Sequence, residues 1–132
     1  MTEASAYVLE EIQGKLESAD KRLADYLRKS TRAISAKKDM EGYENGLKET
    51  LNLLERTVEE YPEDGEMKKI TDRFSIFYSA RHSGSMEAQR AGVSNILADL
   101  KSMVHWRKME TAYGRTLGFS DFRSLRGESK KR

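Results

Sequence analysis

The chain has 132 residues, of which 35% are charged and only 37% are apolar, and its formal net charge is +2. This length suits one domain with its own core, and the charged fraction exceeds the roughly 25% of ordinary soluble domains. The chain has a single proline and few glycines before residue 80, so it lacks the turn-forming residues that connect the strands of a sheet. We therefore expect an all-α fold: an elongated up-and-down helical bundle of about four main helices with heptad-like seams, plus a short C-terminal helix.

Composition also excludes several classes of protein. There is no cysteine, which excludes disulfides and thiolate zinc sites. No run of about 18 apolar residues occurs, and the acidic N-terminus has no basic stretch before an apolar one, so neither a spanning helix nor a signal peptide is expected. We expect a cytoplasmic protein that has no membrane partner.

The first predicted helix follows Thr2, its candidate N-cap, runs to about Lys38 and would be roughly 54 Å long at 1.5 Å per residue. Gly14 weakens it by up to about 1 kcal/mol relative to alanine. Its seam follows steps of three and four: Leu9, Ile12, Leu16, Ala19, Leu23, Tyr26, Ser30 and Ala33. Because this seam continues past Tyr26, we expect a possible homodimer through Leu23, Tyr26, Leu27 and Ile34.

The next two helices are predicted to be shorter. A first break is expected within residues 37–46, followed by a helix from about Tyr43 to Tyr61 that ends before Pro62. The YPEDGE stretch, residues 61–66, is the clearest turn in the chain. A third helix is expected from about Glu66 to Arg81. Either these two helices lie end to end along the first, or part of the first helix protrudes and pairs with a second copy.

The fourth helix is predicted from Met86 to about Tyr113, with Ser85 as its N-cap. Its broad apolar face indicates burial between two neighbours. A second apolar stripe, Trp106, Met109 and Tyr113, needs a cover, for which the candidates are Leu117, Phe119, Phe122 and Leu125. We expect a short helix over residues 121–126 to supply it, so that residues 1–127 form a single domain and 128–132 a disordered basic tail.

The sequence carries no motif of known chemistry. Neither His82 nor His105 follows a glutamate by three residues, as the metal-binding pairs of di-iron bundles require. A phosphate-binding loop, a nucleophile elbow and a dinucleotide fingerprint are all missing. We therefore predict no catalytic residue, metal or cofactor, and no motif resembles a known family closely enough to name one.

One group of basic residues lies in the second half of the predicted first helix. Its members are Lys21, Arg22, Arg28, Lys29, Arg32, Lys37 and Lys38. The following segment, residues 41–66, has nine acidic and two basic residues. We interpret the basic group as a solvated surface that an antiparallel hairpin places beside those carboxylates.

A second basic group occupies residues 101–132, which hold nine basic and three acidic residues interleaved with aromatic ones. It is either the solubilising rim of a packed C-terminal cap, a site for an acidic protein partner, or a nucleic-acid surface. The predicted partner-binding residues are Lys101, Arg107, Lys108, Arg115, Arg123 and Arg126. The function expected is a non-catalytic helical protein–protein interaction module, such as an adaptor, a chaperone or a small subunit of a larger assembly. The alternative is a nucleic-acid-binding protein that uses this basic third of the chain.

Overall fold

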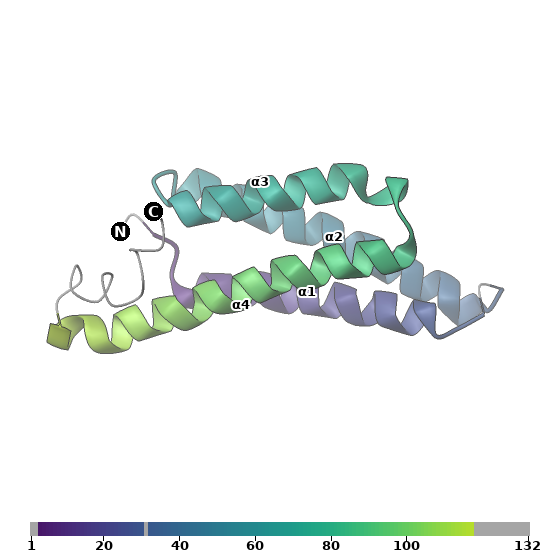
Figure 1. Ribbon diagram of the computed structural model, residues 1–132, viewed down its shortest axis with the longest axis horizontal. Helices are drawn as coiled ribbons and strands as arrows, with labels where there is room; N and C mark the ends of the chain where they lie inside the picture. Colours follow the sequence, from purple (N-terminus) through teal and green to yellow (C-terminus); the bar gives the residue numbers. More distant parts are fainter. Residues whose placement is uncertain (1–2, 31, 118–132) are drawn as a thin grey trace.

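Four antiparallel helices form the bundle in the computed structural model, which describes residues 3–30 and 32–117, with side chains up to residue 112 (Figure 1). The helices are α1 (Ala6–Leu27), α2 (Ile34–Glu60), α3 (Gly65–Ala80) and α4 (Met86–Leu117), with a 3₁₀ turn (Arg81–Ser83) before α4. The chain runs up and down, so that α1 packs against α2 and α4, and α3 packs against the same two helices. The predicted all-α bundle is confirmed, and the described part of the chain contains no strand.

The first helix boundary was predicted in the wrong place. The helix does not continue to Lys38, because α1 ends at Leu27 and α2 begins at Ile34. Residues 37–46, expected to hold the break, lie inside α2 instead. Small residues in register at Ser30 and Ala33 made the first seam look continuous, although they belong to the connection between the helices.

The glycines of residues 37–46 serve the contact between α1 and α2. A Cβ added at Gly46 would lie 2.8 Å from the Cβ of Ala19, which is closer than side chains normally approach. Tyr43 in the same stretch and Leu47 directly after it are fully buried, so the buried face of α2 runs straight through the stretch. As a result α2 lies beside α1, and the two shorter helices are not stacked end to end along one long helix.

The remaining helix ends follow local chemistry. The N-cap of α1 is Ser5, whose Oγ accepts a hydrogen bond from the Val8 N–H at 3.3 Å. The end of α2 before Pro62 is confirmed. Asp64 caps α3, and Ser85 precedes α4 as predicted, its Oγ accepting from the Ala88 N–H at 3.0 Å.

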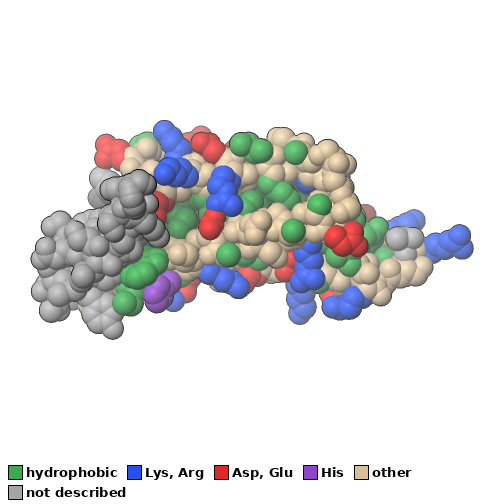
Figure 2. Space-filling view, in the orientation of Figure 1, with side chains coloured by type: hydrophobic (Ala, Val, Ile, Leu, Met, Phe, Trp, Pro, Cys, Tyr) green, Lys and Arg blue, Asp and Glu red, His purple; other side chains and the backbone are tan. Residues whose placement is uncertain are grey.

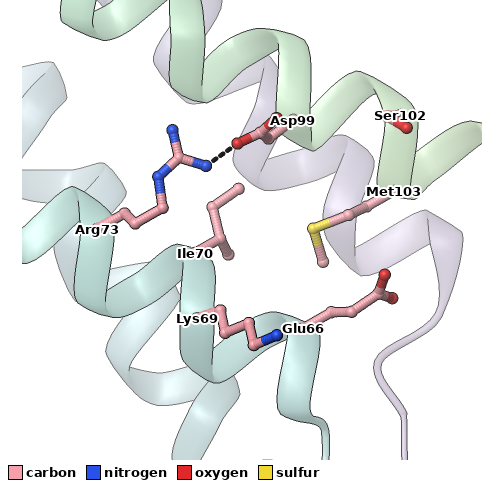
Figure 3. A pocket seen from close by; sticks show the side chains of 7 residues that line it. All are labelled: Glu66, Lys69, Ile70, Arg73, Asp99, Ser102 and Met103. Atoms are coloured by element: carbon pink, nitrogen blue, oxygen red, sulfur yellow. Dashed lines mark ion pairs between the residues drawn. The ribbon is translucent and has the colours of Figure 1, made fainter. Parts of the chain in front are cut away.

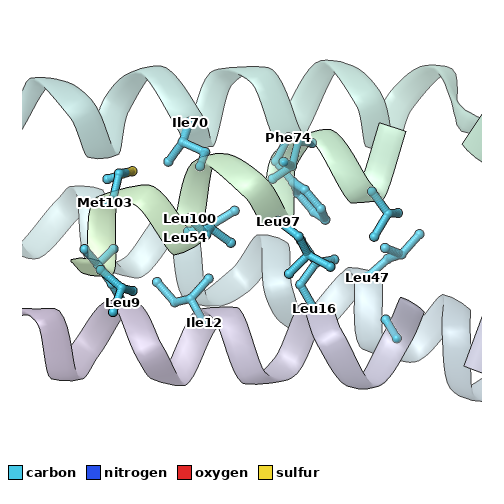
Figure 4. Close-up of a cluster of buried hydrophobic side chains, with 14 of the residues drawn as sticks. Leu9, Ile12, Leu16, Leu47, Leu54, Ile70, Phe74, Leu97, Leu100 and Met103 are labelled. Atoms are coloured by element: carbon cyan, nitrogen blue, oxygen red, sulfur yellow. The ribbon is translucent and has the colours of Figure 1, made fainter. Parts of the chain in front are cut away.

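The core draws apolar side chains from all four helices (Figure 4). Full burial of one such side chain contributes about 1.5–3 kcal/mol. One polar link crosses this core: the Tyr43 hydroxyl donates to Gln89 Oε1 at 2.7 Å. Burial raises the pKa of Tyr43, so its phenol stays neutral and remains a donor. The drawn core residues include Leu9, Ile12, Leu16, Leu47, Leu54, Ile70, Phe74, Leu97, Leu100 and Met103.

At its C-terminal end α4 extends past the other helices (Figure 1). Trp106 and Met109, from the predicted second apolar stripe, are half-buried there. The side chain of Tyr113 lies outside the described residues, as do the predicted helix over 121–126 and the tail 128–132. No helix in the described ranges has both the length and the apolar character needed to cross a membrane.

Candidate protein-binding groove between α3 and α4

The seam between α3 and α4 is loosely filled. These two helices touch each other less extensively than α1 touches α2 or α4. The side of α4 that faces α3 carries Gly92, Asn95 and Ser102, which are small or polar. Phe77 closes the seam at one point, since its ring would lie 2.8 Å from a Cβ added at Gly92. Elsewhere short side chains leave space between the helices.

Two neighbouring cavities occupy this space, and together we call them the α3–α4 groove. The first has a volume of about 260 Å³ and the second about 300 Å³. Figure 3 shows the residues that line the first cavity: Glu66, Lys69, Ile70, Arg73, Asp99, Ser102 and Met103. The second is lined by Arg73, Ile76, Phe77, Gly92, Asn95 and Ile96.

An ion pair between Arg73 and Asp99 crosses the groove where the two cavities meet (Figure 3). Both side chains are about half exposed, and an ion pair so open to water contributes only about 0–1 kcal/mol. The pair therefore bridges the helices without locking them together.

The floor of the groove is apolar and one of its edges is exposed. Ile70, Ile96 and Met103 are buried at its base. Ile76 on α3 is 69% exposed, one of three large apolar side chains in the described residues that lie open to water, with Tyr7 and Ile34. An apolar floor with an exposed isoleucine at its edge is typical of a surface that binds a ligand or a partner.

A buried charged cluster closes one end of the groove. Arg107 of α4 donates to both carboxylate oxygens of Asp64, at 2.6 and 3.0 Å, and to Glu66 Oε1 at 2.8 Å. The same guanidinium donates to the Ala4 carbonyl at 2.8 Å, while the Ala4 N–H donates to Asp64 at 3.0 Å. The side chains of Arg107 and Asp64 are 4% and 0% exposed. The cluster thus ties the N-terminal segment and the α2–α3 turn to α4.

Burial and hydrogen bonding act in opposite directions on this pair. Burial alone would raise the pKa of Asp64, but hydrogen bonds from Arg107 and from the Ala4 N–H outweigh it and hold that pKa below its ordinary value. Burial likewise disfavours the charged form of Arg107, yet its contacts with Asp64 and Glu66 leave its pKa raised. Both groups are therefore ionised in the folded protein.

The structure removes one of the predicted partner-binding residues from the surface. Arg107 is buried in the bundle and is wrong as a surface contact. Lys101 and Lys108 are more than half exposed, but they pair with Glu17 at 3.6 Å and Glu10 at 2.5 Å on α1. Arg115 belongs to α4, but its side chain is not described. Arg123 and Arg126 lie outside the described residues.

The predicted dimer seam is split between core and surface. Leu23 is fully buried within the bundle, and Tyr26 and Leu27 pack partly buried against its core. Ile34, at the start of α2, is 75% exposed. The continuous helix that led us to expect a dimer is absent, so that reason for it is removed, and the homodimer stays a prediction.

Reasoning from the sequence missed both the charged cluster and the groove. A signal for the cluster was present, because Arg107 follows Leu100 and Val104 at the spacing of the buried face of α4. The groove had no such signal, because Gly92 and Asn95, three residues apart on α4, do not form a pattern that a sequence displays. Within the described ranges no group of three or more His, Asp or Glu side chains could hold a metal ion. Comparison with protein-family models, with curated proteins and with solved structures found no match for this chain.

Proposed function

We propose that this protein is a non-catalytic interaction module that binds an amphipathic helix of a partner protein in the α3–α4 groove. The observation that carries this proposal is the groove itself, an apolar trough between two helices with an exposed isoleucine on its edge. Helix-in-groove recognition uses this kind of surface, with apolar anchors from one face of the bound helix.

The length of the groove supports a helix as the occupant. Its lining residues on α3 extend from Glu66 to Phe77, three turns of helix and roughly 16 Å at 1.5 Å per residue. The two cavities are separated by the Arg73–Asp99 ion pair. An incoming helix can therefore place one apolar side chain in each cavity, on either side of that pair.

The charges on the rim indicate what the edge of the partner helix carries. Glu66 and Asp99 are already paired, with Arg107 and Arg73. Lys69 is exposed and makes no ion pair with any residue that the structure describes. The free charge on the rim is positive, so we expect an acidic residue on the partner helix near Lys69.

The test uses a photo-reactive side chain in the groove. Ile76 is replaced by p-benzoylphenylalanine in the full chain, and the same replacement at Lys48, exposed on α2, serves as the control position. After irradiation in the native cells, we expect position 76 to cross-link one protein through an amphipathic helical segment, and position 48 not to do so. A synthetic peptide of that segment should then bind the purified protein.

A matched pair of variants decides whether the groove is the binding site. Ser102→Leu fills the first cavity, while Ser94→Leu adds the same side chain to an exposed position of α4 that lines neither cavity. We expect Ser102→Leu to weaken the binding of the peptide at least tenfold and Ser94→Leu to leave it unchanged. Equal binding by both variants, or equal cross-linking from positions 48 and 76, would contradict the proposal.

A further inference from the structure

A second surface lies at the opposite end of the molecule from the Asp64–Arg107 cluster. We define the α1–α2 tip as residues 21–30 and 32–38, which comprise the end of α1, the described part of the connection and the first turns of α2. In Figure 1 the connection between α1 and α2 extends beyond the one between α3 and α4. The tip is therefore a projecting end of the bundle, and the α3–α4 groove does not include it.

The tip is strongly basic, with seven lysine and arginine side chains and a single carboxylate, Asp25. Figure 2 shows Lys and Arg side chains gathered at this end of the visible face. Two carboxylates neutralise part of this charge. Asp25 pairs with Arg28, and Asp39, just beyond the tip, accepts from Arg22 at 3.1 Å and from Lys29 at 2.6 Å.

Four cations of the tip have no carboxylate partner within the described residues. They are all exposed: Lys21, Arg32, Lys37 and Lys38. Of the carboxylates of α2 expected to compensate them, Glu41 lies one turn beyond Lys37 but makes no ion pair with these cations in the described part of the chain, and the next two are engaged elsewhere. Glu44 accepts from Arg81 at 2.9 Å and Glu49 from Lys15 at 2.9 Å. The interpretation of the first basic group as a compensated surface therefore holds for only part of it.

The start of α2 adds to the positive potential. The first turn of α2 has no acidic residue, and its N-cap, Ala33, has no side chain that could accept a hydrogen bond. The N-terminal end of a helix dipole is itself positive, so Lys37, at the end of the first turn, lies where a cation is disfavoured. An external anion would relieve this repulsion.

We propose that the α1–α2 tip binds the phosphate backbone of duplex nucleic acid. Backbone recognition requires exposed cations, which the tip supplies in excess. It does not require aromatic side chains, and Tyr26, the only aromatic residue of the tip, packs against the core and is not free to stack on bases. The contact is therefore independent of base sequence.

The same features disfavour the other two classes of anionic partner. A protein interface has an apolar or aromatic centre, and the described residues of the tip expose one large apolar side chain, Ile34. A membrane-surface element buries a broad apolar face in the lipid, and one isoleucine supplies little of that. The surplus of cations over apolar area fits phosphates best.

The experiment measures the fluorescence anisotropy of a labelled 20-base-pair DNA duplex with the full chain at several salt concentrations. The test variant changes Arg32, Lys37 and Lys38 to Gln. The control variant changes Lys48, Arg56 and Lys68 to Gln, which removes the same charge from exposed positions outside the tip. Circular dichroism confirms that both variants are folded.

We expect the tip variant to bind at least tenfold more weakly at 0.1 M salt, and the slope of log Kd against log salt to fall by about 3, roughly one for each phosphate that is no longer neutralised. The control variant should change less than twofold. Equal weakening in both variants would overturn the proposal, because binding would then follow net charge alone.

Two further arms exclude other sources of binding. A variant with Arg123, Arg126 and Lys130 changed to Gln tests the C-terminal basic residues, and binding abolished there but kept in the tip variant would overturn the proposal. Vesicles containing anionic phosphatidylserine test the membrane alternative, and binding to vesicles but not to DNA would also overturn it. Neither arm involves the α3–α4 groove, so its result is separate from the test of the proposed function.

Discussion

The α1–α2 seam and the α3–α4 seam both join antiparallel neighbours in one bundle, but they are filled to different degrees. In the first, α1 and α2 approach so closely that a Cβ at Gly46 would lie 2.8 Å from Ala19. In the second, Phe77 approaches Gly92 equally closely at one point, but cavities of about 260 and 300 Å³ also lie between the helices, and an exposed ion pair bridges them. Close packing makes the first seam a stabilising element, and the space in the second leaves room for a partner.

The two seams also differ in what holds them. Apolar contacts run along the α1–α2 seam, where Leu23, Tyr43 and Leu47 are fully buried. The α3–α4 side has buried apolar residues only at the floor of its groove, such as Ile70 and Ile96, and the pairing of Asp64 with Arg107 at one end. A seam that is held at its floor and at one end can admit a side chain above the floor while the bundle stays folded.

The largest change in the free energy of unfolding is expected on removal of the Asp64–Arg107 pair at the end of the α3–α4 groove. Asp64→Ala leaves Arg107 buried without its main partner, and removal of one member of a buried pair costs about 3–5 kcal/mol. Urea unfolding followed by circular dichroism measures this destabilisation. Lys15→Ala, which breaks the exposed pair with Glu49, is the control and should cost about 0–1 kcal/mol. Similar destabilisation of the two variants would mean that the cluster does not fasten this side.

Acid should weaken the Asp64–Arg107 pair and so lower the free energy of unfolding. The pKa of Asp64 is lowered by folding, so the stability that its charge contributes is complete above the ordinary value of 3.8 and is lost as the pH falls through the lower folded value. We expect Asp64→Asn to flatten this acid limb of the free energy of unfolding, measured by urea titration from pH 6 to pH 2. A limb as steep as that of the native protein would show that Asp64 does not contribute to it.

A methyl group at the close seam should be the next most damaging change. Gly46→Ala forces α1 and α2 apart at Ala19, and overpacking of this kind costs about 1–3 kcal/mol. The helix propensity of alanine offsets this by up to about 1 kcal/mol. The measurement is the change in the urea midpoint. A variant more stable than the native protein would contradict the close contact.

Gly14 on α1 is a glycine where an added methyl group should stabilise the protein. A Cβ there meets nothing within 4 Å, so Gly14→Ala adds helix propensity without a clash. We expect the free energy of unfolding to rise by about 0.5–1 kcal/mol. Thermal unfolding of the two glycine variants side by side sharpens the contrast, and destabilisation by Gly14→Ala would count against it.

The smallest effect on stability is expected at the edge of the groove. Ile76 is 69% exposed, so Ile76→Ser should change the free energy of unfolding by no more than about 0.5 kcal/mol. The same change should weaken the binding of the cross-linked partner peptide. A large drop in stability would indicate that Ile76 belongs to the core and is not a free contact.

The helical class, the four-helix order and two of the three connections between helices were predictable from spacing and turn chemistry. Pro62 and Ser85 acted through local effects that a sequence displays directly. The first connection was not predictable in this way, because Gly46 meets Ala19 on another helix and only the packed structure shows why a glycine is there. Local sequence pattern does not distinguish a glycine at a close approach from a glycine in a turn.

The candidate site was less accessible to sequence reasoning. Arg107 lies among basic residues in the chain, so it was predicted as a surface contact, but its charge is cancelled by Asp64, 43 residues away. The groove depends on missing side-chain volume, as at Ser102, and an unfilled space has no motif. The basic residues of the α1–α2 tip were recognised as a group, yet only the fold shows which of them are paired.

The central claim is that extra apolar volume is accepted at the α3–α4 seam and rejected at the α1–α2 seam. The most direct test is the free energy of unfolding of two variants that each gain a leucine, Ser102→Leu in the groove and Ala19→Leu against Gly46. We expect Ser102→Leu to be as stable as the native protein or up to about 1 kcal/mol more stable, since the leucine fills a cavity with an apolar floor. Ala19→Leu should be destabilised by about 1–3 kcal/mol or more. Equal destabilisation by the two leucines would contradict this difference between the seams.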